Sequence, residues 1–219
     1  MSNPDEASVS ATPDPGRPDR LALTAAVVTA VLSFTPVADA PGSVFIVGAC
    51  LFWAVFVAIR AWQHPGVFRA WGFRADNLLE ASVLPVGVLV AGMGCLATLG
   101  SLRGTFRFPA HALPLFLVYP VWGVIQQFLM LGVVASNLER IDALGRRKVL
   151  IVLLVALIFG LIHVSNRRLI VATFVLELLI VPLYLWQRNL WPLGVLHGWL
   201  GGLFYLWVEN RDLWVERFG

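Results

Sequence analysis

Charged residues are scarce in this chain. They make up 13% of its 219 residues, whereas hydrophobic residues make up 58%, and the mean hydropathy is +0.79. A soluble domain of this length carries roughly a quarter charged residues, so the scarcity excludes that class. The apolar runs also lack the alternation of polar and apolar positions that a transmembrane β-barrel requires. The composition therefore predicts an all-α, polytopic helical membrane protein.

Cysteine and clustered positive charge are lacking as well. Cys50 and Cys95 each lie inside an apolar run without a second ligand at a recognised spacing, which favours small buried hydrophobic side chains over a disulfide or a metal site. The net charge is +3, but the basic residues stand at the ends of apolar runs. This spacing is typical of loop anchors in membrane proteins. It excludes a nucleic-acid partner and makes the lipid bilayer the first expected partner.

The apolar runs divide the chain into about seven predicted transmembrane helices, each close to the twenty or so residues that span the hydrocarbon core. The runs cover residues 21–38, 43–62, 78–100, 110–136, 149–164, 169–187 and 190–208. Residues 1–19 are rich in proline and aspartate, so we expect them to form a disordered cytoplasmic tail. We expect residues 20–219 to form a single membrane domain.

The segment at residues 64–77 alternates aromatic residues with arginines. That composition suits a stretch in the headgroup region, so we expect Phe68, Trp71 and Phe73 to dip into lipid. An excess of basic residues on the side of the tail and of this segment favours a cytoplasmic N-terminus. Arginine greatly outnumbers lysine, as is typical of a GC-rich bacterial genome. The predicted spans place the chain in a membrane, most simply the bacterial inner membrane.

A few polar side chains lie well inside the apolar runs. They are Gln126, Gln127, His163, Glu177 and His197. In hydrocarbon an amide without a hydrogen-bond partner costs roughly a few kcal/mol, so these side chains should face protein or trapped water. The glutamines and the two histidines come from three different runs. Their convergence in one polar pocket is the functional interpretation of this pattern.

The same residues also have structural interpretations. A histidine inside a membrane can serve only as a hydrogen-bond link between helices, and the glycines around His197 can serve only close helix packing. Glu177 is either a charge held by Arg167 or Arg168 or an acid that burial keeps protonated.

Three short motifs follow one another in the second half of the chain. Residues 126–131 are Gln-Gln-Phe-Leu-Met-Leu, residues 159–163 are Phe-Gly-Leu-Ile-His, and residues 197–201 are His-Gly-Trp-Leu-Gly. In order and spacing they resemble the motifs Glu-Glu-x-x-x-Arg, Phe-x-x-x-His and His-x-x-x-Asn or Asp of the CPBP or Abi family of CAAX-processing intramembrane proteases. The resemblance covers residues 78–208 and implies an intramembrane protease core over that range.

The resemblance implies a mechanism in which a first-motif glutamate and the second-motif histidine activate a water, while the third motif steadies the oxyanion. This chain departs from the family there. Gln126 and Gln127 replace the two glutamates, Leu131 replaces the arginine, and Gly201 replaces the asparagine or aspartate. A glutamine amide donates and accepts hydrogen bonds but does not take a proton from water. Loss of a general base lowers the rate by about 10²–10⁴, and loss of an oxyanion donor by about 10²–10³.

Three functions follow from these observations. The first is a catalytically impaired family member that binds a membrane-embedded peptide, a lipidated tail or a partner protein without cutting it. The second is an active endopeptidase in which His163 and His197 work with a non-standard acid, either with Glu177 as a displaced carboxylate or with all three holding zinc. The third is a helical membrane scaffold or transporter component, in which the polar residues only join helices.

Overall fold

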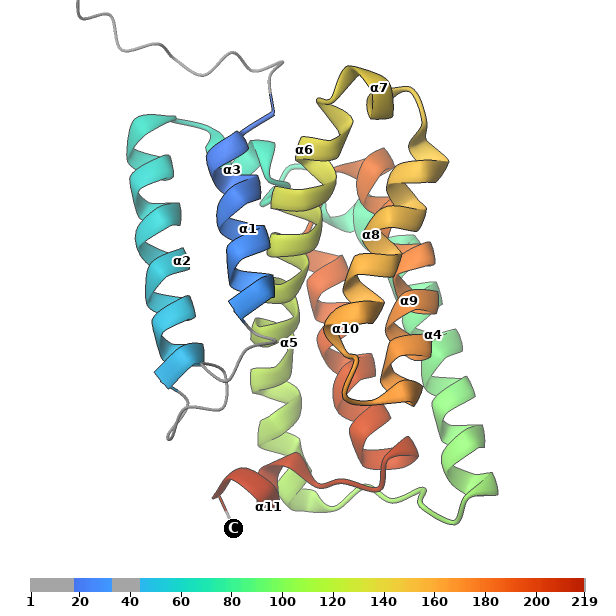
Figure 1. Ribbon diagram of the computed structural model, residues 1–219. Coiled ribbons are helices and arrows are strands. Elements are labelled where there is room, and N and C mark those ends of the chain that lie inside the picture. Colours follow the sequence, from blue (N-terminus) through green and yellow to red (C-terminus); the bar gives the residue numbers. More distant parts are fainter. Residues whose placement is uncertain (1–17, 33–43, 219) are drawn as a thin grey trace, which may run out of the picture.

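The computed structural model describes residues 18–32 and 44–218, which form only helices and their connections (Figure 1). The predicted disordered tail lies outside the described residues, apart from residues 18 and 19. The α-helices are α1 (Arg20–Leu32), α2 (Val44–Gln63), α3 (Val67–Ala70), α4 (Leu78–Leu102), α5 (Leu113–Gln127), α6 (Ser136–Glu139), α7 (Asp142–Gly145), α8 (Lys148–Ile162), α9 (Arg167–Gln187), α10 (Trp191–Leu203) and α11 (Leu213–Phe218). A 3₁₀ turn, η3 (Ala110–Ala112), precedes α5, and two π-helices, η4 (Phe128–Ala135) and η5 (Phe204–Val208), continue α5 and α10.

Several of the described helices are long and apolar enough to cross a membrane. They are Leu78–Leu102, the continuous helix Ala110–Glu139, and Arg167–Gln187. Shorter apolar helices lie at Arg20–Leu32, Gly48–Gln63 and Lys148–Ile162. The predicted all-α polytopic membrane fold is therefore confirmed, whereas the count of seven spans stays a prediction.

The ends of the helices follow local sequence signals. The Asn166 side chain accepts hydrogen bonds from the backbone nitrogens of Arg168 (3.0 Å) and Leu169 (3.1 Å), which caps the start of α9. That helix ends at Arg188, whose φ of +53° is left-handed. Pro192 stands in the first turn of α10, where a missing backbone N–H costs no intrahelical hydrogen bond.

Helix α10 lies between α5 and α4, and α8 packs along α9 (Figure 1). Glycines bring the backbones of α5 and α10 into direct contact. A Cβ atom on Gly198 would lie 2.5 Å from the Tyr119 carbonyl oxygen, and one on Gly194 would lie 2.5 Å from the Val124 Cα. A Cβ on Gly123 would overlap the carbonyl oxygen of Gly194. Only glycine permits this approach, which is the small-residue packing common between membrane helices.

The outward surfaces of the helices are apolar. Leu79 is 88% exposed and Leu117 is 79% exposed, an arrangement that suits lipid rather than water. Cys50 and Cys95 are free thiols and both are exposed. The prediction that they are buried was therefore wrong, because a small apolar side chain is equally suited to a lipid-facing position.

The segment before α4 packs against the protein more than the sequence predicted. The rings of Trp71 and Phe73 lie 5.0 Å and 5.7 Å from that of Phe128, measured between centroids. The Tyr184 hydroxyl also donates to the Trp71 carbonyl oxygen (3.0 Å), which holds the segment against α9. Only Phe68 of the three aromatic residues is exposed. Trp71 and Phe73 are partly buried against the core, so the expectation that they dip into lipid stays a prediction.

Asn189 connects the start of α10 to the start of α4. Its buried amide nitrogen donates to the Arg74 carbonyl oxygen (3.0 Å) and to Asn77 Oδ1 (2.9 Å), and its oxygen accepts from the backbone of Trp191 (3.2 Å). The Arg74 guanidinium pairs with Asp76 at 2.6 Å and lowers the pKa of that carboxyl to about 2. The entry to α10 is thus fixed by a buried amide, with an ion pair at the surface beside it.

Candidate functional site

Gln126, His163 and His197 meet in one small pocket of about 100 Å³. Gln126 lies one residue before the end of α5, His163 is the residue that ends α8, and His197 lies in the middle of α10. The structure therefore brings together the candidates from all three motifs. The remaining lining residues are Tyr119, Trp122, Leu169, Thr173, Gly198, Gly201 and Tyr205.

The hydrogen bonds assign a role to each ring nitrogen. The Phe159 carbonyl oxygen can only accept, so His163 Nδ1 donates to it (2.8 Å), and His163 Nε2 keeps its lone pair. His197 Nε2 donates to Gln126 Oε1 (3.2 Å), while His197 Nδ1 is buried without a partner. The Phe159 ring stands edge-on to both imidazoles, with centroids 5.1 Å from His163 and 5.2 Å from His197.

Gln127 and Glu177 lie outside this pocket. Both side chains are fully buried, and the Gln127 amide nitrogen donates to Glu177 Oε1. Arg168, which the sequence offered as a partner of Glu177, instead bonds Glu209. Glu177 therefore does not orient His163. Of the two adjacent glutamines, Gln126 faces the pocket and Gln127 bonds Glu177.

The proposed zinc ligands also do not come together. Among the residues that the structure describes, no group of three or more histidine, cysteine, aspartate or glutamate side chains could hold a metal ion. His163 and His197 face the pocket, but Glu177 bonds Gln127. A catalytic zinc needs three protein ligands, so the set of these two histidines and Glu177 does not fit one.

The comparisons with known proteins agree with the motifs. Residues 108–203 match the family model described as type II CAAX prenyl endopeptidase Rce1-like. This segment is Rce1-like. It runs from just before η3 to the end of α10 and contains every motif residue of the pocket. No curated protein and no solved structure shows a significant match to the chain. The predicted family resemblance is confirmed for these residues.

The departures from the motifs differ in their surroundings within the Rce1-like segment. Leu131, in place of the arginine, is fully buried in the apolar core. Gly201, in place of the asparagine or aspartate, lines the pocket, and a Cβ there would meet no atom closer than Tyr119 Cε1 at 3.9 Å. Position 131 is therefore part of the apolar core, whereas position 201 has room for a side chain in the pocket.

Several pocket residues were missed by the sequence analysis. Tyr119 and Trp122 lie seven and four residues before Gln126 on the same helix face. Thr173 lies one turn before Glu177, and Tyr205 follows the third motif. Helical spacing from the motif residues would have found the first two, because residues four and seven apart share one side of a helix.

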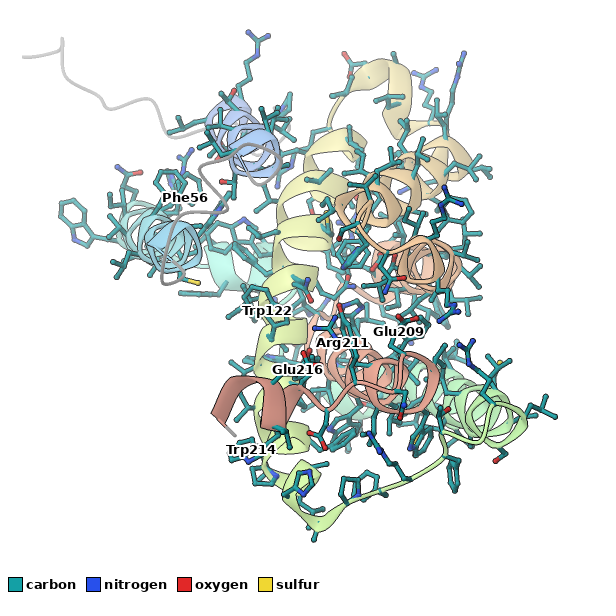
Figure 2. All side chains as sticks on the ribbon, turned by 60° about the horizontal axis from the view of Figure 1, so that its bottom comes forward. Phe56, Trp122, Glu209, Arg211, Trp214 and Glu216 are labelled. Atoms are coloured by element: carbon teal, nitrogen blue, oxygen red, sulfur yellow. The ribbon has the colours of Figure 1, made fainter. Side chains whose placement is uncertain are left out.

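The segment after η5, which carries Glu209, Arg211, Trp214 and Glu216, runs across one end of the helical bundle (Figure 2). Glu209 accepts a hydrogen bond from Asn166 Nδ2 (3.1 Å), close to the loop that carries His163. The guanidinium of Arg211 lies 5.4 Å from the centroid of the Tyr205 ring, which lines the pocket. This segment therefore contacts residues around the pocket at this end of the bundle.

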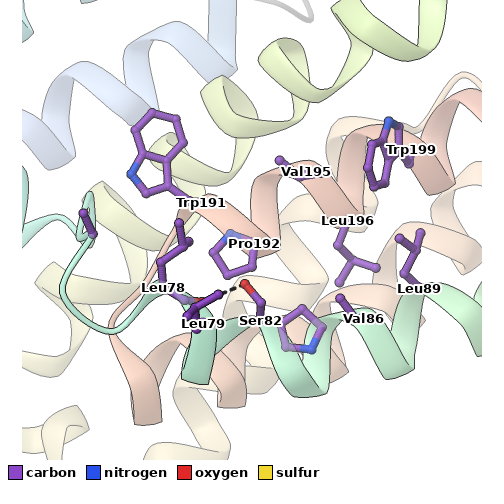
Figure 3. A pocket seen from close by; sticks show the side chains of 12 residues that line it. Leu78, Leu79, Ser82, Val86, Leu89, Trp191, Pro192, Val195, Leu196 and Trp199 are labelled. Atoms are coloured by element: carbon purple, nitrogen blue, oxygen red, sulfur yellow. Dashed lines mark hydrogen bonds between the residues drawn. The ribbon is translucent and has the colours of Figure 1, made fainter.

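A larger apolar hollow of about 550 Å³ lies between α4 and α10, apart from the polar pocket (Figure 3). Leu196 and Trp199 line it from α10, and Leu79 and Val86 line it from α4. Ser82 also lines the hollow, and its hydroxyl donates to the Leu78 carbonyl oxygen (2.7 Å). Helix α10 therefore presents a polar face to one cavity and an apolar face to another.

Proposed function

We propose that this chain is a catalytically impaired relative of the CAAX-type intramembrane proteases, which binds a membrane-embedded peptide, a lipidated tail or a partner protein without cutting it. One observation carries the proposal. The pocket holds Gln126 bonded to His197 with His163 beside them, and no carboxylate is among its lining residues. The group that would take a proton from water is therefore missing where the family has it.

The pocket offers the hydrogen bonds that a peptide group needs. Gln126 uses its oxygen for His197, which leaves its NH₂ group as a donor, and His163 Nε2 is an acceptor. A peptide unit presents one carbonyl acceptor and one N–H donor. The amide in place of a glutamate thus changes this position from one that can activate water to one that can bind a carbonyl oxygen.

The proposed setting is the lipid bilayer of the bacterial inner membrane, with the N-terminus in the cytoplasm and without a nucleic-acid partner. The arginine distribution supports the orientation, and the apolar outer surface supports the bilayer as solvent. The hollow between α4 and α10 is a second supporting feature, because its apolar lining suits the chain of a lipidated tail.

The decisive experiment restores the missing carboxylate. The protein is reconstituted in lipid nanodiscs with a fluorescent prenylated CAAX-type peptide, and binding and cleavage are measured for the unaltered chain and for Gln126→Glu. Gln63→Glu is the matched control. Gln63 is exposed at the end of α2, so this substitution adds the same charge outside the pocket. We expect binding without cleavage by the unaltered chain and by the control, and cleavage by Gln126→Glu at a rate roughly 10²-fold or more above theirs.

Adding Gly201→Asn to Gln126→Glu should raise the cleavage rate by a further factor of about 10²–10³, because the new side chain supplies the missing oxyanion donor. The open space around Gly201 admits it. Cleavage by the unaltered chain, or absence of peptide binding, would overturn the proposal.

An active endopeptidase with His163 as the base is the second candidate function. The observation in its favour is the hydrogen bond from His163 Nδ1 to the Phe159 carbonyl oxygen, which leaves Nε2 as a proton acceptor in the pocket. This candidate predicts that the unaltered chain cleaves the peptide and that His163→Ala abolishes the cleavage.

A further inference from the structure

Gln127 and Glu177 form a polar contact in the buried interior between α5 and α9. Each side chain is 0% exposed, and the Gln127 amide nitrogen donates to Glu177 Oε1. The pair lies beside the pocket and not in it, since neither residue is among the pocket's lining. The proposed peptide-binding activity therefore leaves this buried acid without a role.

The hydrogen bonding of the pair is incomplete if Glu177 is ionised. Gln127 Oε1 and Glu177 Oε2 are both buried without a partner. The ion pairs in the described part of the chain use other carboxylates, such as Glu139 with Arg188 and Glu209 with Arg168. An ionised Glu177 would thus carry a buried charge without a cation, and two acceptor oxygens would lack a donor. Both conditions are costly in an apolar interior.

A single proton removes both deficits. A protonated Glu177 has a hydroxyl donor at Oε2, and Gln127 Oε1 is an acceptor without a partner. The planar acid then presents one donor and one acceptor, and the planar amide matches them with its carbonyl oxygen and one of its two N–H groups. The pair becomes neutral, and every polar atom within it has a partner.

We propose that Gln127 and a neutral, protonated Glu177 form an acid–amide pair that joins α5 to α9 and positions the two walls of the pocket. Gln127 directly follows Gln126 on the α5 wall, and Thr173 on the α9 wall lies one turn before Glu177. Glu177 is accordingly a positioning residue. The pair stands on its own contacts, and only its bearing on the pocket rests on the proposed function.

The pair also gives the two glutamines different roles. Position 127 is occupied by the partner of a buried acid, so a glutamate there would set two carboxyl groups against each other. Position 126 alone faces the pocket and can return a carboxylate to it. We therefore expect Gln126→Glu to cleave faster than the double variant Gln126→Glu with Gln127→Glu.

Infrared difference spectroscopy tests the proton directly. The spectrum of the unaltered chain minus that of Glu177→Gln, both in nanodiscs at neutral pH, should contain the C=O band of a protonated carboxylic acid. Glu209→Gln is the matched control, because Glu209 bonds Arg168 and Asn166 and should give only carboxylate bands. A difference spectrum for Glu177 that contains carboxylate bands and no acid band would overturn the proposal.

A double-mutant cycle tests the pair. Glu177→Leu and Gln127→Leu each leave one buried polar group unpaired, so each should lower the melting temperature by roughly 5 °C. The double Leu variant should lose less than either one does, since it leaves no unpaired group. Glu177→Gln, a neutral isostere, should stay within about 2 °C of the unaltered chain. Additive losses, or an equal loss for Glu177→Gln and Glu177→Leu, would contradict the pair.

The ring nitrogens of His197 report the positioning role. In folded samples, solid-state ¹⁵N spectra should show that Glu177→Leu alters the His197 Nε2 signal, because the Gln126 bond is displaced, and that Glu177→Gln leaves it unchanged. An unchanged signal in both variants would reduce the pair to a stabilising contact. Should a Leu variant fail to fold, the infrared spectrum and Glu177→Gln still decide the question. The infrared, melting and ¹⁵N measurements do not use cleavage, so a failure of the proposed function is distinguishable from a failure of the pair.

Discussion

Helix α5 meets its two neighbours at the pocket in different ways. Towards α10, Gly194 and Gly198 bring the two backbones into direct contact. Towards α9, Gln127 reaches Glu177 through two long side chains. The first contact has no atoms that can move aside, whereas the second has several rotatable bonds. The spacing of α5 and α10 is therefore set by the backbone. The spacing of α5 and α9 is set by two side chains that can be exchanged, and we expect the orientation of Gln126 to depend on it.

The largest effect should come from a methyl group placed in the backbone crossing. Gly198→Ala puts a Cβ at 2.5 Å from the Tyr119 carbonyl oxygen, so the helices must separate. We expect a loss of about 3 kcal/mol or more in the free energy of unfolding, together with loss of peptide binding. Thermal unfolding in detergent and the peptide-binding assay measure the two losses.

The control for that prediction is Gly201→Ala, three residues further along the same helix. Its Cβ would meet no atom closer than 3.9 Å, so its stability should stay within about 1 kcal/mol of the unaltered chain. Equal losses in Gly198→Ala and Gly201→Ala would show that the crossing is not rigid and would remove the contrast between the two contacts of α5.

A smaller effect is expected at the start of α10. Asn189→Ala removes the amide that bonds the Arg74 carbonyl oxygen and Asn77, and should cost about 1–3 kcal/mol. Since the glycine crossing holds the middle of α10, peptide affinity should change by less than about threefold in the folded variant. Ser82→Ala, whose hydroxyl bonds only the Leu78 carbonyl oxygen of its own helix, is the control for the unfolding measurement. A large loss of peptide affinity in a fully folded Asn189→Ala variant would mean that the start of α10, and not its glycine contact with α5, determines the shape of the pocket.

The smallest effect should come from the surface ion pair next to that entry. Arg74 lowers the pKa of Asp76 in the folded state, so the stabilisation is present above the ordinary pKa of aspartate and is lost as the pH falls towards about 2. Asp76→Asn should therefore melt at a slightly lower temperature than the unaltered chain at neutral pH. The difference should vanish as the pH falls from about 4 to about 2. A difference that persists at the low end would assign it to packing and not to charge.

The sequence alone predicted the helices closely, because the bilayer imposes a strong and simple requirement. Apolar runs at residues 78–100 and 169–187 became helices at Leu78–Leu102 and Arg167–Gln187. Backbone polar groups in hydrocarbon must be satisfied within the helix, so hydropathy and length nearly suffice. Composition alone could not show that Trp71 and Phe73, unlike the exposed Phe68, pack partly against the ring of Phe128.

The site was predicted only in part. Motif spacing gave Gln126, His163 and His197, which the structure gathers in one pocket. It gave no means of separating Gln126 from Gln127, although one residue along a helix turns the side chain by about 100° and so decides between the pocket and the interior. The partner of Glu177 lies 50 residues away on another helix, and no local pattern in the sequence connects them.

The π-helix Phe128–Ala135 lies directly after the two glutamines. A π turn holds about one residue more than an α turn, so the segment is equivalent to an α-helix with a one-residue insertion. Removing a single residue there would let the α-helix continue and would rotate Ser136 and Asn137 by about 100° relative to Gln126. When relatives of this chain are aligned, a one-residue gap in this segment therefore marks a change of helical pitch, and residues on its two sides need separate registers.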